Sequence, residues 1–219
     1  MKKPALFVFA MLCLSFLVFQ NLYAQNRKGI VYKITDEENV YYAAIETKYF
    51  KYFISEQRNT NWCWAACVQM VLNYQGADAP QEEIVKRVKG DMVNDGGTEE
   101  DIVKGADGWE VGGRSLAASY EQCYCKTCKN YREEPDIGRM LAELKDKSPI
   151  IARLKIPKDE TRASWVITGI KFKRLNGNNV KPLQVILRDP WPGNSDDKTF
   201  MDWDEFSNRL QSIIFVDML

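Results

Sequence analysis

The sequence predicts a protein of the α+β class, because helical patterns fill the first half of the chain and strand patterns fill the second half. Apolar residues recur at helical spacing in four segments: 62–74, 80–88, 98–103 and 136–146. Short apolar runs typical of strands follow at 150–156, 165–172, 183–187 and 212–216. Asn176-Gly177 predicts a hairpin between the second and third of these runs. We therefore expect N-terminal helices packed on an antiparallel, barrel-like sheet.

The first 24 residues predict a cleaved export signal. Lys2 and Lys3 precede an apolar stretch over residues 5–19, and the small residue Ala24 precedes Gln25. An uncleaved membrane anchor is the alternative, because this stretch approaches the length that spans a bilayer. We expect residues 25–219 to form a single exported domain, in the periplasm or outside the cell.

The charge of the expected mature chain is nearly balanced. Removal of Lys2 and Lys3 leaves 28 of the 30 basic side chains, against 30 acidic ones, which gives a net charge of about −2. Both signs are interspersed along the chain, without a basic stripe. We therefore expect no nucleic-acid partner and no contact with the membrane after signal removal. We also expect no cofactor, and no metal at the Cys63 site.

The segment before the first long helix predicts two strands, 30–34 and 40–44, joined by a turn at 36–39. The helix over 62–74 then ends at Gly76, which is typical of a helix C-terminus. Its start places Cys63 on the first helical turn.

Terminal signals also delimit the shorter helices. Pro80 starts one helix, Thr98 begins a capping box for the next, and Asp202 starts a short helix that carries Phe206 and Leu210. The helix over 136–146 lies between Pro135 and Pro149. Residues 105–134 show little periodicity, so we expect a loop there.

Cys63 lies in the stretch NTNWCWAACVQMVLNY, residues 59–74. A helix N-terminus favours a thiolate over a thiol through its unpaired N–H groups and its dipole. A cysteine in such a place can also be a small buried hydrophobic residue. Gln57 lies six residues upstream of this cysteine.

Gln57 and the Asn61-to-Ala66 stretch together resemble the nucleophile motif of papain-like cysteine peptidases. The resemblance is greatest to the bacterial branch that includes bacteriocin-processing domains and secreted effector proteases. It extends over residues 50–217, because the later strands and Asp189-Pro190 resemble the family's second half. The resemblance implies that Cys63 is at the nucleophile position, Gln57 at the oxyanion position and Asp189 at the position that orients the catalytic histidine.

The chain departs from this family at the histidine, since it contains no histidine at all. Alignment on Val166-Ile167-Thr168-Gly169 places the missing residue at Ala163, or at Ser164 if the loop shifts by one position. Imidazole serves as base and acid because its pKa lies near neutrality, and neither of these side chains can replace it. We expect a pseudoenzyme whose cleft binds a peptide or protein ligand.

Other functions stay open at this point. An active thiol peptidase would need a non-standard base, such as Asp159 or Glu160 in the loop before Ala163. A structural role without a ligand is a third possibility. The candidate ligand-binding aromatics, which would otherwise pack in the core, are Trp62, Trp64, Trp165 and Trp191.

Four further cysteines follow Cys63: Cys67, Cys123, Cys125 and Cys128. In an exported protein this even number suggests two disulfides. We expect Cys67 to pair with one of the other three, and the remaining two to close a small ring. A zinc site in the close Cys123-to-Cys128 cluster is the alternative.

Overall fold

The computed structural model describes residues 29–33, 36–123, 135–157, 162–177, 179–194 and 198–219. Nine strands in these residues form one sheet. They are β1 (Gly29–Lys33), β2 (Val40–Ile45), β3 (Glu110–Val111), β4 (Arg114–Gln122), β5 (Ile150–Lys155), β6 (Arg162–Arg174), β7 (Val180–Arg188), β8 (Lys198–Asp202) and β9 (Leu210–Met218). The order is β1-β2-β6-β5-β9-β4-β3, with β7 and then β8 added on β6, and every pair is antiparallel.

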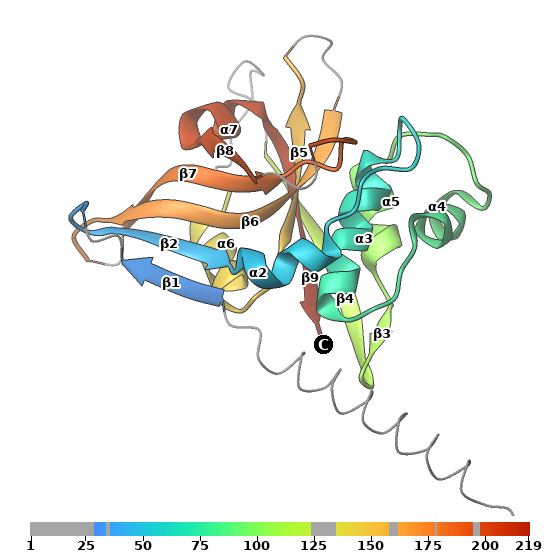
Figure 1. Cartoon of the computed structure of the whole chain (residues 1–219), viewed down its shortest axis with the longest axis horizontal. Helices are drawn as coiled ribbons and strands as arrows, with labels where there is room; N and C mark the ends of the chain where they lie inside the picture. Colours follow the sequence, from blue (N-terminus) through green and yellow to red (C-terminus); the bar gives the residue numbers. More distant parts are fainter. Residues whose placement is uncertain (1–28, 34–35, 124–134, 158–161, 178, 195–197) are drawn as a thin grey trace, which may run out of the picture.

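The helices are α2 (Thr47–Phe50), α3 (Cys63–Gln75), α4 (Gln81–Lys89), α5 (Glu99–Ala106), α6 (Ile137–Lys145) and α7 (Trp203–Arg209), with a 3₁₀ turn at Lys51–Phe53. Figure 1 shows α3, α4 and α5 gathered on one side of the molecule, with β1, β2, β6, β7 and β8 on the other. The core lies between them, and α3 contacts both β5 and β6. The chain therefore has the predicted α+β fold, with Cys63 at the start of a helix that packs on the sheet.

Local signals fix the ends of the helices that surround Cys63. α3 ends at Gly76, whose φ of 107° is a left-handed conformation that favours glycine. α5 begins with a capping box, in which Thr98 and Asp101 exchange hydrogen bonds between side chain and backbone. Burial raises the pKa of Asp101, but hydrogen bonds from Lys89 and from the Thr98 backbone outweigh it and hold this pKa below its usual value.

One prediction about the chain's irregular parts is wrong, and one strand was not predicted. Residues 105–134 are not all loop, because β3 and β4 lie within them, and β4 pairs with β9 over Leu116–Gln122. β8 was not expected either, and it pairs with β7. β4 is stabilised by β9 at the far end of the chain, and β8 is stabilised by the preceding strand, β7, so the short patterns of β4 and β8 give little signal by themselves.

The expected export signal lies outside the described residues, so the domain start at residue 25 stays a prediction. Within the described residues, no helix has both the length and the apolar character that crossing a bilayer requires.

Candidate functional site

A cavity of about 740 Å³ lies where the start of α3 meets the sheet. Four segments line it: the turn before Cys63, the loop between α4 and α5, the facing ends of β5 and β6, and the turn after β7. The structure thereby brings Gln57, Cys63, Ala163 and Asp189, which are far apart in the sequence, to the walls of one cavity.

Cys63 is half-buried at the first position of α3. The N-cap residue, Trp62, contributes no side-chain cap, so the first-turn N–H groups are not occupied by its side chain. Cys67 lies one turn later and is fully buried, which raises the pKa of its thiol well above the usual range. Only the first of these two cysteines therefore faces the cavity.

Gln57 is buried and braces the turn that leads into α3. Its Nε2 donates hydrogen bonds to the carbonyls of Asn59 and Thr60, at 3.0 and 2.9 Å. Its backbone N–H donates to the carbonyl of Pro190, at 2.8 Å. An amide nitrogen carries two hydrogens, so both are engaged in this conformation. The predicted oxyanion donor therefore needs a rearrangement of the turn before it can bind a ligand oxygen.

A buried glutamine on α4, Gln81, forms hydrogen bonds with the segment that contains Gln57. Gln81 is fully buried, and its Nε2 lies within hydrogen-bonding distance of Ser55 Oγ, the Glu56 carbonyl and Gln69 Oε1. Its Oε1 accepts a hydrogen bond from the Arg58 N–H, at 3.0 Å. This network fixes the backbone on both sides of Gln57.

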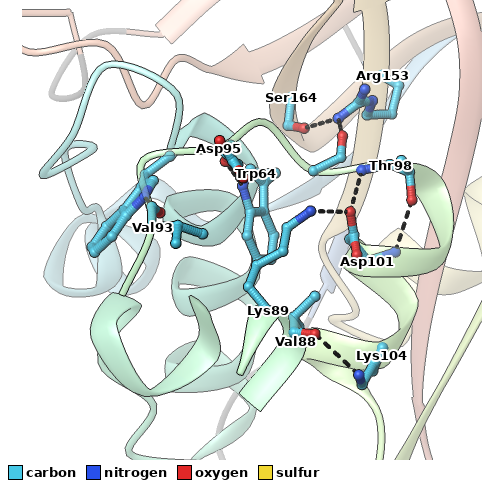
Figure 2. A network of polar contacts seen from close by, with 12 residues as sticks. Trp64, Val88, Lys89, Val93, Asp95, Thr98, Asp101, Lys104, Arg153 and Ser164 are labelled. Atoms are coloured by element: carbon cyan, nitrogen blue, oxygen red, sulfur yellow. Dashed lines mark hydrogen bonds and ion pairs between the residues drawn. The ribbon is translucent and has the colours of Figure 1, made fainter. Parts of the chain in front are cut away.

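Ala163 and Ser164, the two candidate positions for the missing histidine, lie at the start of β6 and line the cavity. The cross-strand neighbour of Ser164 is Arg153 on β5, which also lines the cavity and is 5% exposed. Arg153 Nη1 donates to the Gly97 carbonyl at 2.6 Å and to Ser164 Oγ at 3.4 Å (Figure 2). The charged group beside the histidine position is therefore a guanidinium.

The guanidinium cannot perform the task of an imidazole. Burial lowers the pKa of Arg153, whereas the nearby Glu99 carboxylate and the Cys63 sulfur raise it. Arginine nevertheless stays protonated in proteins, so it neither accepts nor returns a proton near neutral pH.

Asp189 follows β7, and its carboxylate is used locally. Its Oδ1 accepts a hydrogen bond from the Trp191 N–H at 2.9 Å, and its Oδ2 lies 3.4 Å from Asn194 Nδ2. Such a bond to the backbone two residues ahead is typical of an aspartate that starts a turn. The carboxylate thus stabilises the turn that forms one wall of the cavity.

The four candidate tryptophans divide into two pairs. Trp165 and Trp191 line the cavity, and Trp191 is 53% exposed. Trp62 and Trp64 are instead buried in the core.

The buried pair acts on the cavity indirectly. Trp62 Nε1 donates to the carbonyl of Val93 at 2.8 Å. Trp64 Nε1 donates to the carbonyl of Asp95 at 3.1 Å (Figure 2). These bonds anchor the loop that contributes Gly96 and Gly97 to the cavity wall. Trp62 and Trp64 therefore pack in the core and hold the loop that carries Gly96 and Gly97; they do not line the cavity.

In the part of the chain that the structure describes, Cys67 is a fully buried free thiol on α3 and forms no disulfide, contrary to the prediction. Cys123 is buried directly after β4. Cys125 and Cys128 lie outside the described residues, and so do Asp159 and Glu160, the candidate alternative bases. The pairing or zinc binding of the Cys123-to-Cys128 cluster stays a prediction.

Three residues of the site were not predicted from the sequence: Arg153, Glu99 and Gly97. Glu99 is buried, lies 3.9 Å from Arg153 Nε and 3.5 Å from Arg162 Nη1, and accepts a hydrogen bond from Ser212 Oγ at 3.0 Å. The signal that could have found Arg153 is a charged residue within the otherwise apolar strand Ile150-Ile151-Ala152-Arg153-Leu154.

Comparison with known proteins gives a family match. Residues 47–216 match the Peptidase_C39 like family. A search of curated proteins finds no match. Three solved structures are similar at low sequence identity.

The first is the peptidase domain of Streptococcus ComA, a bifunctional ABC transporter of a quorum-sensing pathway, at 18% identity and a TM-score of 0.48, with 74% of this chain and 96% of that one covered. The second is a double-glycine-motif protease from an AMS/PCAT transporter in complex with the leader peptide, at 16% identity and a TM-score of 0.42, with 87% and 94% covered. The third is digestive procathepsin L2 from the larval midgut of Tenebrio molitor, at 12% identity and a TM-score of 0.45, with 78% and 67% covered.

Proposed function

Because this chain belongs to the Peptidase_C39 like family, we propose that it is a papain-like peptidase homologue that binds peptides in the Cys63 cavity without hydrolysing them. The observation that carries the proposal is the lining of the cavity around Cys63. Ala163, Ser164 and the buried guanidinium of Arg153 lie there, where the family's mechanism requires an imidazole. Loss of one member of a catalytic unit typically lowers the rate about a thousandfold or more.

The cavity suits a peptide. Its volume of about 740 Å³ is within the range of ligand sites. Trp165 and the exposed Trp191 offer aromatic surface at its wall, and aromatic side chains supply much of the contact energy in peptide grooves. A peptide that enters would lie between these tryptophans and the start of α3.

The test uses a mixture of random, N-acetylated hexapeptides and the immobilised protein. We expect retention of a subset of peptides, and mass spectrometry should find no new peptide termini beyond those of a Cys63→Ala control. Trp191→Ala should weaken retention, whereas Tyr52→Ala, which removes an exposed aromatic ring outside the cavity, should not. Cleavage that disappears in Cys63→Ala would refute the non-catalytic proposal, and absence of any retention would refute peptide binding.

We also propose that the protein is exported to the periplasm or the cell exterior, which the pattern of residues 1–24 supports. N-terminal sequencing of the protein recovered from its native host should then start at Gln25. A start at Met1 in a membrane fraction would support the anchor instead.

A further inference from the structure

We propose that the cavity recognises a carboxylate of its bound peptide and that Arg153 is the residue that holds it. This inference rests on the proposed function, since it specifies which chemical group of a bound peptide the cavity selects. The carboxylate comes either from the peptide's C-terminus or from an aspartate or glutamate side chain.

The first support is the hydrogen bonding of Arg153. A guanidinium has five N–H donors in a planar fork that matches the two oxygens of a carboxylate. The bonds to Gly97 and Ser164 both use Nη1. Nε is buried, lies 3.9 Å from Oε1 of Glu99 and makes no hydrogen bond within the described residues, so a ligand can be held only through Nη2. Within the described residues Nη2 donates to no partner, and a buried arginine with a free donor beside a cavity is unusual, because buried polar groups are normally paired.

The second support is the local balance of charge. Arg153 and Arg162 both line the cavity, and the carboxylate near both of them is that of Glu99, at 3.9 and 3.5 Å. Among the described residues, two cations thus share one carboxylate on this wall, which leaves one excess positive charge there. Asp189 adds a negative charge at the opposite turn, where it accepts the Trp191 N–H. An entering carboxylate would therefore be attracted to the wall formed by β5 and β6.

The third support is the space beside Cys63. Ala163 and Ser164 are small, and both line the cavity next to Arg153 in the β5–β6 register. A peptide that approaches Cys63 can therefore place a carboxylate near the guanidinium. The small side chains of Ala163 and Ser164 thus leave room for an anion beside the guanidinium of Arg153, at the position of the family's histidine.

The experiment compares two peptide mixtures of the same random sequence, one with free C-terminal acids and one with C-terminal amides. Both are N-acetylated hexapeptides, mixed in equal amounts and presented to the full protein. Mass spectrometry of the retained fraction gives the acid-to-amide ratio. A bond between a guanidinium and a carboxylate predicts an enrichment of acids of about tenfold or more. If the retained amides are instead enriched in aspartate or glutamate to a similar degree, the recognised carboxylate is that of a side chain.

Three variants test the assignment to Arg153. Arg153→Gln should remove the preference for a carboxylate, whereas Arg87→Gln, which makes the same change of charge on the exposed face of α4, should keep it. Ala163→Glu places a carboxylate in the cavity itself and should abolish the preference without altering Arg153. Because this variant keeps the buried ion pair with Glu99, it remains informative if Arg153→Gln does not fold.

The outcomes separate this inference from the proposed function. Retention of acids and amides in equal amounts, without enrichment of acidic side chains, would overturn carboxylate recognition and leave peptide binding standing. Failure to retain either mixture would overturn both. A carboxylate preference that persists in Arg153→Gln, or in Ala163→Glu, would overturn the role of Arg153.

Discussion

Substitution of Gly97 by alanine should be much more damaging than the same substitution of its neighbour, Gly96. Both glycines line the cavity. A Cβ atom at Gly97 would lie 2.5 Å from Cγ of Trp64, whereas a Cβ at Gly96 would meet nothing within 4 Å. Trp64 is fully buried and its Nε1 is held by the Asp95 carbonyl, so the ring cannot easily move away. The loop must therefore shift in Gly97→Ala.

The size of the effect follows from two contributions. Overpacking of a core contact costs about 1–3 kcal/mol. The shift also weakens the 2.6 Å bond from Arg153 to the Gly97 carbonyl, and a hydrogen bond to a charged group contributes about 1.5–3 kcal/mol. Part of each cost is relieved by relaxation, so we expect a loss of about 2–4 kcal/mol in the free energy of unfolding for Gly97→Ala. For Gly96→Ala we expect a change within about 0.5 kcal/mol.

The assay is urea unfolding of both variants, followed by far-ultraviolet circular dichroism. The dependence of the unfolding free energy on urea concentration is compared between the two variants. The acid-to-amide ratio of retained peptides provides a second readout, since a shifted Gly97 carbonyl releases Arg153. Equal stability of the two variants would refute the close packing of Gly97 on Trp64 and the rigid support that it gives to the cavity wall.

Three further predictions concern the surroundings of the cavity. Gln81→Ala removes a fully buried side chain together with its hydrogen bonds to the Glu56 carbonyl and the Arg58 N–H, and should cost about 2–3 kcal/mol in urea unfolding. Glu82→Gln, in the adjacent exposed ion pair, should cost less than about 1 kcal/mol, and similar costs would contradict the bracing role. Because the pKa of Asp101 is lowered in the folded state, its carboxylate stabilises the fold above the unfolded pKa and loses this effect as the pH falls through the folded pKa. Asp101→Asn should therefore have a lower free energy of unfolding than the unsubstituted protein at pH 7, and the difference should close below about pH 3.8. A difference that does not depend on pH would be inconsistent with this coupling. Iodoacetamide should label Cys63 but not Cys67 in the native protein at pH 8, and it should label both after unfolding. Equal labelling of the two cysteines in the native protein would show that Cys67 is not buried.

The elements around the site were predictable because their signals are local. Gly76 ends α3 and the Thr98 capping box starts α5, as the sequence indicates. β4 was missed because its residues, Arg-Ser-Leu-Ala-Ala-Ser-Tyr-Glu-Gln, alternate weakly and its stabilisation comes from β9 at the other end of the chain. The sequence pattern of β4 alone does not show that β9 pairs with it.

The candidate site was predictable only in part. Resemblance to a family identified Gln57, Cys63, Ala163 and Asp189, and the structure places all four at one cavity. The sequence marks Arg153 only as a charge within an apolar strand, and its place in the site depends on the register of β5 against β6 and on the Gly97 carbonyl. The sequence likewise could not show which tryptophans face the cavity, because burial of Trp62 and Trp64 is decided by the packing of α3.

The most direct measurement of the central claim is the fate of one retained peptide held with a stoichiometric amount of the protein. The peptide and the intact protein are weighed by mass spectrometry at intervals over several days. Binding without catalysis predicts an unchanged peptide mass and no acyl adduct on Cys63 at any time. Accumulation of an acylated Cys63, or of peptide fragments that Cys63→Ala does not produce, would contradict it and show that another group performs the work of the missing histidine.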